Sequence, residues 1–377
     1  MNANQIAVQK WTLVNYPEDH FVASRDAKYV SDETIELDNL QFDGTKESTS
    51  STTFPPDHVV VQVEALSVDA FIRTMLDREA YHGSVKPGAI LPAMGYGVVR
   101  AAGPDAKYKP GSRVTGILGA TTVAILPNDQ LNPVLIFPRI PSSLSLGYLG
   151  LSGLTAYVGL FGAPPKAPGR GDTVVVSAAA GAVGHIAAQM ARLAGATRVV
   201  GIAGGPDKKA FLLETLGLDG AIDYKDETQS LEAQLDTQCP DGVDFFFDSV
   251  GGDTLETVLS RINQSARVVI CGAISQYSSG NINKKNQVQG PSTYIKLAEK
   301  SASMTGFNVM HHPWAMAKAI PYLVWHYYRG NIHVPEHVEG DLKAFPSALE
   351  SMFEGGTHCG RLLIDVDGSL GKARDRS

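Results

Sequence analysis

The chain has 377 residues, a formal net charge of −7, 44% hydrophobic residues and 19% charged residues. This length allows two or three domains, and the acidic balance argues against nucleic acid or an anionic membrane surface as a partner. No apolar run approaches the roughly 18 residues of a spanning helix, and the N-terminus lacks a basic segment followed by an apolar one, so we expect a cytoplasmic protein with no membrane partner.

The N-terminal part of the chain has the pattern of a β-rich domain. Strand-like runs cover Gln5–Leu13, Thr34–Leu40 and Val59–Val63, and a polar loop covers Glu47–Thr53. Residues 83–119 are rich in glycine, proline and valine, with frequent turn signals. Short strands separated by many turns are typical of a β-barrel.

A strand, helix, strand unit follows at residues 171–205. Thr173–Val176 is a short β-branched run, which indicates a buried parallel strand. Apolar residues then recur at helical spacing from Ile186 to Leu193, and Val199–Ile202 forms the next β-branched run. This order predicts a right-handed βαβ unit of the dinucleotide-binding kind.

The turn between the first strand and the helix lies where a dinucleotide-binding glycine motif is expected. Gly181, Ala182, Val183 and Gly184 would let a pyrophosphate approach the backbone at a helix N-terminus. Ala179 replaces the first glycine of G-x-G-x-x-G, but the flanking strands supply the context that the motif requires. The alternative is an ordinary packing helix rich in alanine and glycine.

The end of the second strand indicates which nicotinamide cofactor is used. Residues 201–205 contain no carboxylate for a ribose 2'-hydroxyl, and Asp207, Lys208 and Lys209 follow. An ammonium group can neutralise a 2'-phosphate, so the pattern favours NADP(H) over NAD(H). The alternative is that both lysines are solvated at the start of a helix.

Strands and helices continue to alternate down to the C-terminal region. We expect helices at Leu151–Phe161, Thr293–Lys300, Trp314–Tyr328 and Leu342–Phe353, and strands at Ala221–Tyr224, Val243–Asp248, Arg267–Cys271, Ser303–Val309 and Arg361–Val366. The predicted fold is a doubly wound parallel Rossmann sheet, residues 151–329, inserted in a β-rich domain of residues 1–150 and 330–377. The last residues, Lys372–Ser377, have the composition of a disordered tail.

This domain order resembles the medium-chain dehydrogenase/reductase superfamily, whose β-rich domain is a GroES-like barrel. Zinc-dependent members carry a cysteine and a Gly-His-Glu where this chain has Ser67–Phe71 and Gly95–Tyr96–Gly97, so we expect no metal. His333 and His337 are four residues apart, but Pro335 argues against the helix that would align them. Three cysteines are too few for a four-cysteine zinc site or a disulfide framework.

Seven motifs in order give a closer resemblance. They are SVDAFIR (67–73), GLTAY (153–157), AAAGAVG (178–184), DYK (223–225), PDGVDFFFDSVGG (240–252), CGAISQY (271–277) and GFNV (306–309). They are similar to the family of leukotriene B4 12-hydroxydehydrogenase/prostaglandin reductases, which includes alkenal double-bond reductases and curcumin reductases. The resemblance implies a zinc-free, NADPH-dependent homodimer that reduces α,β-unsaturated carbonyl compounds.

The resemblance also implies which residues hold the cofactor. The glycine turn would take the pyrophosphate, Lys208 and Tyr224 the 2'-phosphate, and Thr155 the nicotinamide side. At two of these positions the family has an asparagine and this chain does not. They are Ser249, in FDSVGG, and His358, before Gly360. The segments expected near the nicotinamide are Cys271, Gly272, Ala273, Ile274, Ser275 and Tyr277, together with Phe307, Asn308 and Val309.

Three tyrosines are candidates for the substrate side. We expect hydride transfer to the β-carbon of an enone or enal, followed by protonation of the enolate at the α-carbon, with Tyr277 as the hydrogen-bond donor near the carbonyl oxygen. The alternative for Tyr277 is a structural tyrosine. Tyr96 would line the pocket or donate the proton, or simply pack, and Tyr81 would line the pocket. Arg73 would form an ion pair with Asp69 or a neighbouring carboxylate.

Three functions remain open at this point. The first is an NADPH-dependent ene-reductase, the second is a quinone or carbonyl oxidoreductase on the same scaffold, and the third is a non-catalytic NADP-binding sensor. Fold alone does not choose among them.

Overall fold

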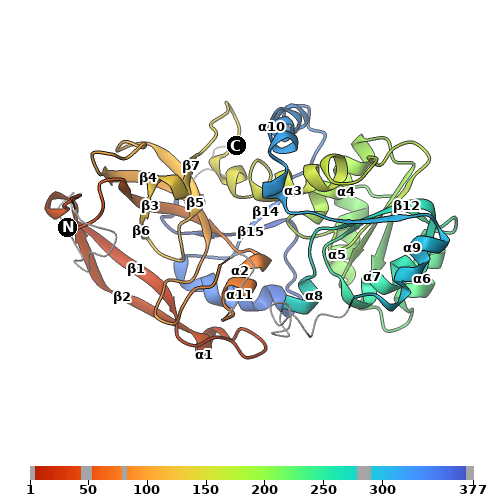
Figure 1. Ribbon diagram of the computed structural model, residues 1–377. Coiled ribbons are helices and arrows are strands. Elements are labelled where there is room, and N and C mark those ends of the chain that lie inside the picture. The colour runs from red at the N-terminus through yellow and green to blue at the C-terminus, as the bar shows by residue number, and fades with distance from the viewer. Residues whose placement is uncertain (1–4, 44–52, 79–82, 278–289, 371–377) are drawn as a thin grey trace. The chain divides into compact units, whose positions relative to one another are not determined.

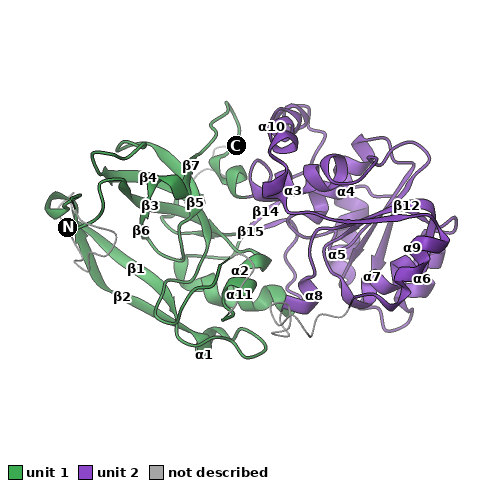
Figure 2. Ribbon diagram, in the orientation of Figure 1, with its two compact units in different colours: residues 1–146, 338–354, 362–377 green, residues 147–337, 355–361 purple. Residues whose placement is uncertain are grey.

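The computed structural model describes residues 5–43, 53–78, 83–277 and 290–370. Most of the predicted loop Glu47–Thr53, the candidate Tyr81 and the predicted tail Lys372–Ser377 lie outside these residues. The chain divides into two compact units (Figure 2). Unit 1 comprises residues 1–146, 338–354 and 362–377, and unit 2 comprises residues 147–337 and 355–361.

Unit 1 is built around an antiparallel sheet in the order β14-β15-β3-β4-β5-β7, with β6 also paired to β3; the chain passes from unit 2 to unit 1 within β14. A separate hairpin is formed by β1 and β2 (Figure 1). The elements are β1 (Gln5–Leu13), α1 (Ala23–Asp26), β2 (Ala27–Glu36), η1 (Leu37–Asn39), β3 (His58–Ser67), α2 (Ala70–Met75), β4 (Met94–Ala102), β5 (Arg113–Ile117), β6 (Val123–Pro127), η2 (Asn128–Gln130), β7 (Leu131–Pro133), η3 (Ser142–Leu146), β14 (Glu336–Val338), η8 (Leu342–Ala344), α11 (Phe345–Phe353) and β15 (Arg361–Asp365).

The centre of unit 1 is the pair β3 and β4. Most residues of β3 are buried, and Val61, Leu66 and Ile72 join Phe345 and Leu349 of the C-terminal return in one core. Gly97 of β4 is required by this pairing, because a Cβ there would lie 2.1 Å from the carbonyl oxygen of Gln62.

Unit 2 contains a parallel sheet in the order β10-β9-β8-β11-β12-β13. Numbered within the unit this order is 3-2-1-4-5-6, that of the dinucleotide-binding fold. The elements are α3 (Leu151–Tyr157), the π-helical turn η4 (Val158–Gly162), β8 (Thr173–Val176), α4 (Gly184–Leu193), β9 (Arg198–Ala203), α5 (Pro206–Ala210), the π-helical turn η5 (Phe211–Thr215), β10 (Gly220–Asp223), α6 (Leu231–Gln238), β11 (Val243–Asp248), α7 (Gly252–Leu259), β12 (Ile262–Ile270), α8 (Ile274–Tyr277), η6 (Ser292–Tyr294), α9 (Ile295–Glu299), β13 (Ser303–Gly306), η7 (Val309–His311) and α10 (Pro313–Tyr328).

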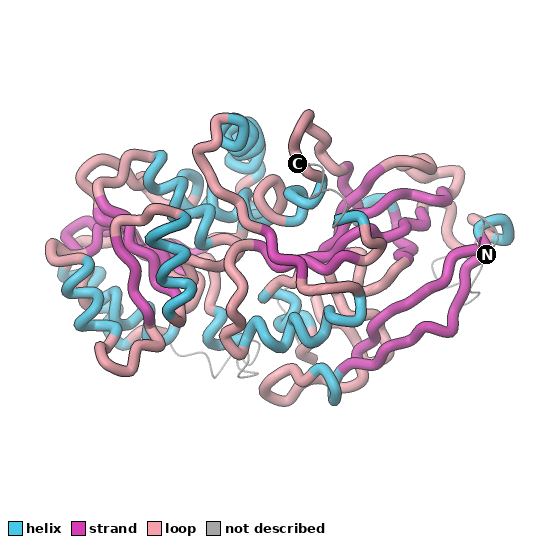
Figure 3. The backbone as a smooth tube through the Cα atoms, turned by 180° about the vertical axis from the view of Figure 1, so that it is seen from behind, coloured by secondary structure: helices cyan, strands magenta, loops and turns pink. Residues whose placement is uncertain are grey.

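Helices lie on both faces of this sheet, as Figure 3 shows from behind. In the first group of helices, α4 packs on β8 and β9, α3 packs against α4, and α10 packs against α3. The second group includes α6, which contacts β10 and α7, and α7, which contacts β11. Parallel strands covered on both faces are apolar throughout, and Val174, Val175 and Phe245–Phe247 are completely buried.

The predicted fold class is confirmed, and the strands Gln5–Leu13, Thr173–Val176 and Val243–Asp248 have the predicted bounds. The predicted strand Thr34–Leu40 overlaps β2 only at Thr34–Glu36, so its bounds are wrong. β2 begins at Ala27, because Ala27–Val30 pairs with Lys10–Leu13 of β1, and Leu37–Asn39 turns as a 3-10 helix. The sequence pattern did not predict this pairing, because much of β2 is polar and exposed.

Three predicted elements of unit 2 also differ in extent. The helix predicted at Leu151–Phe161 changes to a π-helical turn after Tyr157. The strand predicted to begin at Arg267 begins five residues earlier, at Ile262. The strand predicted at Ser303–Val309 ends at Gly306.

Candidate cofactor site in unit 2

The candidate site lies where the order of the parallel strands reverses, at the carboxyl ends of β8 and β11. Asp248, the last residue of β11, is fully buried. Its Oδ1 accepts a hydrogen bond from Ser177 Oγ at 2.8 Å, and its carboxylate accepts the N–H groups of Val250 and Gly251, each at 3.0 Å. Burial raises the pKa of Asp248, and these hydrogen bonds oppose the rise. The carboxylate thus fixes the turn after β11, a role that the sequence analysis missed.

The glycine turn follows β8 directly and fits a pyrophosphate. Ala178 takes a left-handed conformation with φ 47°. A Cβ on Gly184 would lie 2.2 Å from the Ala178 carbonyl oxygen, so only glycine fits there. Among the described residues, no acceptor is recorded for the amides of Ala182 and Val183. Free N–H groups at the start of a helix are the donors that bind a phosphate.

Lys208, Tyr224 and Lys225 lie around the ends of β9 and β10. The Tyr224 ring covers Gly204, where a Cβ would lie 2.7 Å from the ring. Burial lowers the pKa of Lys208, the Cys359 thiol opposes this, and the charge of Lys225 lowers the pKa further. Two neighbouring ammonium groups suit a phosphate dianion. Lys225 was missed by the sequence analysis, although it belongs to the DYK motif.

The segment Cys271–Tyr277 follows β12 and packs on the turn after β11. The amide of Cys271 donates to the Asp248 carbonyl at 2.7 Å, and the amide of Ile274 donates to the Ser249 carbonyl at 3.1 Å. Burial raises the pKa of Cys271 to about 12, and the nearby Ser249 side chain opposes the rise. This thiol therefore stays protonated at neutral pH. The segment brings Gly272, Ala273 and Ser275 beside the same turn.

Tyr277 folds back over the start of its own segment. Its phenol oxygen accepts the amide of Ala273 at 3.3 Å and would lie 2.9 Å from a Cβ on Gly272. Burial raises the pKa of Tyr277, so its hydroxyl keeps its proton. Since the Ala273 bond uses an acceptor site, the phenol proton is available to a second partner.

Phe307, Asn308 and Val309 follow β13, and the Phe307 ring lies beside η4. A Cβ on Gly159 would meet the Phe307 ring at 3.0 Å, and Gly159 is one helical turn beyond Thr155. Asn308 Oδ1 accepts the amide of Met310 at 3.0 Å. The Phe307 ring therefore lies next to the helical turn that follows Thr155.

His358 belongs to residues 355–361, which return to unit 2. The amide of Gly360 donates to the Ala180 carbonyl at 2.8 Å, and the His358 ring lies 6.4 Å from that of His337. The segment that carries His358 therefore contacts the glycine turn.

The remaining candidates lie in unit 1. Tyr96 is 4% exposed and packs with Ala65, Val134 and Leu363. Arg73 is fully buried and forms its ion pair with Asp77, at 2.8 Å. Asp69 accepts the Ser67 hydroxyl at 2.7 Å. Arg73 is thus held in a structural ion pair with a neighbouring carboxylate.

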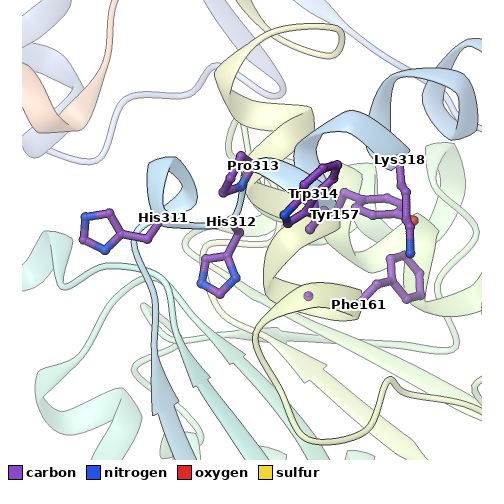
Figure 4. A pocket seen from close by; sticks show the side chains of 9 residues that line it. Tyr157, Phe161, His311, His312, Pro313, Trp314 and Lys318 are labelled. Carbon is purple, nitrogen blue, oxygen red and sulfur yellow. The ribbon is translucent and has the colours of Figure 1, made fainter.

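A cavity of about 390 Å³ lies on unit 2, between α3, η4 and α10 (Figure 4). Tyr157 and Phe161 face Trp314 and Lys318 of α10 across it. The remaining lining residues are Gly162, His311, His312, Pro313 and Ala315. The glycine turn does not contribute to this cavity, which therefore lies apart from the predicted pyrophosphate site.

The described residues include neither a metal-binding cluster nor a membrane-spanning helix. No group of three or more His, Cys, Asp or Glu side chains in the described ranges could hold a metal ion. His333 lies on an irregular segment and His337 lies on β14, so no helix aligns the two, as the proline between them predicts. Within the same ranges, no helix is both long and apolar enough to cross a membrane.

The chain is similar to known oxidoreductases over most of its length. Residues 182–323 match the family model described as zinc-binding dehydrogenase. A putative NADP-dependent oxidoreductase YfmJ of Bacillus subtilis (strain 168) is 36% identical, covering 82% of this chain and 88% of that protein. Prostaglandin reductase 1 of Mus musculus is 35% identical, covering 81% and 89%.

A plant relative and a solved structure agree with these matches. The NADP(+)-dependent 2-alkenal reductase of Nicotiana tabacum is 34% identical, covering 79% of this chain and 84% of that protein. CurA from Vibrio vulnificus, solved in complex with NADPH, superposes with a TM-score of 0.79 at 27% identity, covering 95% and 99%. With its Rossmann strand order and its glycine turn, the chain therefore belongs to the zinc-free alkenal and prostaglandin reductase family of the medium-chain dehydrogenases/reductases.

Proposed function

We propose that this protein uses NADPH to reduce the C=C bond of α,β-unsaturated aldehydes and ketones. The observation that carries the proposal is the glycine turn of unit 2, with its free amides and the Lys208–Lys225 pair at the end of the neighbouring strands. The named activities of the tobacco, mouse and peppermint relatives, the last a (+)-pulegone reductase, support the choice of a conjugated carbonyl as substrate.

Different residues of unit 2 bind different parts of the cofactor. The amides of Ala182 and Val183 bind the pyrophosphate, and Lys208, Tyr224 and Lys225 bind the 2'-phosphate. Thr155, Ser249, the 271–277 segment, Phe307–Val309 and His358 surround the rest of the cofactor. When bound, NADPH supplies the hydride.

Tyr277 is the proposed donor toward the substrate carbonyl. Its oxygen is held by the Ala273 amide, which leaves the phenol proton free to hydrogen-bond an oxygen that gains negative charge. Tyr96 of unit 1 remains a candidate for lining the pocket or donating a proton. We propose that unit 1 supplies the substrate side and that unit 2 binds the cofactor.

The test is an assay with separate readouts for the two reducible bonds. The purified protein is incubated with NADPH and a panel of enals, enones and quinones, and the products are identified by mass spectrometry and NMR. We expect loss of the conjugated double bond with the carbonyl intact. Carbonyl or quinone reduction alone would favour the second function, and NADPH binding without any oxidation would favour a sensor.

We also propose that the protein is a cytoplasmic homodimer, as the family resemblance implies. Two features of unit 2 support self-association. Among the described residues β13 is the last strand of its sheet, and α10 exposes Trp325 and Tyr328, with 59% and 50% of their surfaces accessible. An open sheet edge and exposed aromatic side chains are surfaces that a second copy can cover.

A further inference from the structure

His185 directly follows the last glycine of the turn and lies in the first turn of α4. The residue is 2% exposed, and its Nδ1 lies 2.8 Å from the Gly181 carbonyl oxygen. A carbonyl oxygen only accepts hydrogen bonds, so Nδ1 must carry the proton. The imidazole is therefore a donor aimed back at the turn.

The imidazole of His185 is uncharged, because its second nitrogen, Nε2, is buried without a hydrogen-bond partner among the described residues. Burial lowers the pKa of His185 to about 4, the bond to Gly181 opposes this, and His333 and Arg361 lower the pKa further. At neutral pH the ring therefore holds a single proton, on Nδ1.

The bond from His185 sets the direction of an amide in the turn. The Gly181 carbonyl and the Ala182 N–H belong to one planar peptide group and point in opposite directions. The imidazole and the His185 amide, at 3.1 Å, both hold the Gly181 carbonyl on the side of the helix. The Ala182 N–H must then face away from the helix, where no acceptor is recorded among the described residues.

The preceding peptide is fixed in the same way. The Ala180 carbonyl accepts the Gly360 amide at 2.8 Å, so it is held by the returning segment and not by His185. Gln189 anchors α4 behind the turn, because its side chain exchanges two hydrogen bonds with the backbone of His333, at 2.9 and 2.7 Å. With the helix and the first carbonyl held independently, the Gly181–Ala182 peptide is the element that His185 controls.

We propose that His185 is a positioning residue, which aims the Ala182 amide at the pyrophosphate of the dinucleotide by holding the Gly181 carbonyl. The inference rests on the proposed function, because the anion is that of NADP(H). A rotated peptide would present a carbonyl oxygen to the anion, and the binding energy of one charge-assisted hydrogen bond would be lost.

The test compares three variants of the full chain. His185→Leu removes the donor at similar volume, His185→Gln removes the Nδ1 donor but stays polar, and His185→Asn keeps an N–H near the Nδ1 position. Dissociation constants for NADPH and NADH are measured by isothermal titration calorimetry. We expect His185→Leu and His185→Gln to weaken both dinucleotides by the same factor, about 5- to 10-fold for one hydrogen bond, and His185→Asn to restore most of the affinity.

A matched control separates the turn from the 2'-phosphate site. Lys208→Ala should weaken NADPH and leave NADH unchanged, whereas the His185 variants affect both. Circular dichroism and melting temperature check folding, and His185→Gln replaces His185→Leu if the latter does not fold. Unchanged affinity in the donor-less variants, or equal weakening in His185→Asn, overturns the inference alone. Failure of the wild type to bind NADPH overturns the proposed function as well.

Discussion

Tyr277 illustrates how a single side chain can serve both the backbone and a substrate. Its oxygen is anchored by the Ala273 amide, and burial raises its pKa so that the proton stays in place. The anchoring bond positions the phenol without using its proton. A structural tyrosine and a hydrogen-bond donor to the substrate are therefore compatible roles for this residue.

Replacing Tyr277 with phenylalanine separates these roles. We expect Tyr277→Phe to lower kcat by about 10-fold or more, since one donor to a developing oxyanion is removed, while the dissociation constant for NADPH changes less than about twofold. Steady-state kinetics and a cofactor titration measure the two effects. Tyr224→Phe is the control and should affect NADPH affinity more than kcat. An unchanged kcat in Tyr277→Phe would remove the phenol from the mechanism.

Among the elements, α4 connects cofactor binding with stability toward acid. The first turn of this helix buries His185, whose pKa falls from 6.5 to about 4. Between these pH values the unfolded chain binds a proton that the folded chain excludes. The free energy of unfolding must therefore fall as the pH decreases through this window, by up to about 1.4 kcal/mol per unit of pKa shift.

We expect urea unfolding midpoints to show this dependence directly. The midpoint of the wild type should decrease from pH 7 to pH 5 more steeply than that of His185→Asn, which cannot take up the proton. His20→Asn, a change at an exposed histidine, should follow the wild type. Parallel curves for all three proteins would show that His185 does not contribute to acid sensitivity.

The region around α4 shows which features the sequence can predict and which it cannot. The strand Thr173–Val176, the glycine turn and the helix after it follow from local pattern, because β-branched runs and glycines act through neighbouring residues. Asp248 and Gln189 were missed because their partners lie far along the chain. Ser177 is 71 residues from Asp248, and His333 is 144 residues from Gln189. An acidic residue ending the apolar run Phe245–Phe247 was the available signal for Asp248.

At the scale of the whole molecule, self-association is the property that the exposed surfaces of unit 2 predict. We expect light scattering after size-exclusion chromatography to give twice the chain mass of 40.2 kDa. Trp325→Glu should reduce the dimer fraction if α10 takes part, because a carboxylate would be buried in the interface. Trp11→Phe, a change in unit 1, is the control. A wild type of single-chain mass would contradict the homodimer.

The path of the chain also fixes when this binding site can be completed. The glycine turn is made early in unit 2, but the Ala180 carbonyl receives its donor from Gly360, 180 residues later. During synthesis on the ribosome, the turn must therefore wait for nearly all of the polypeptide to emerge. The complete site can therefore bind the dinucleotide only late in translation, after the strands of unit 2 have been synthesised.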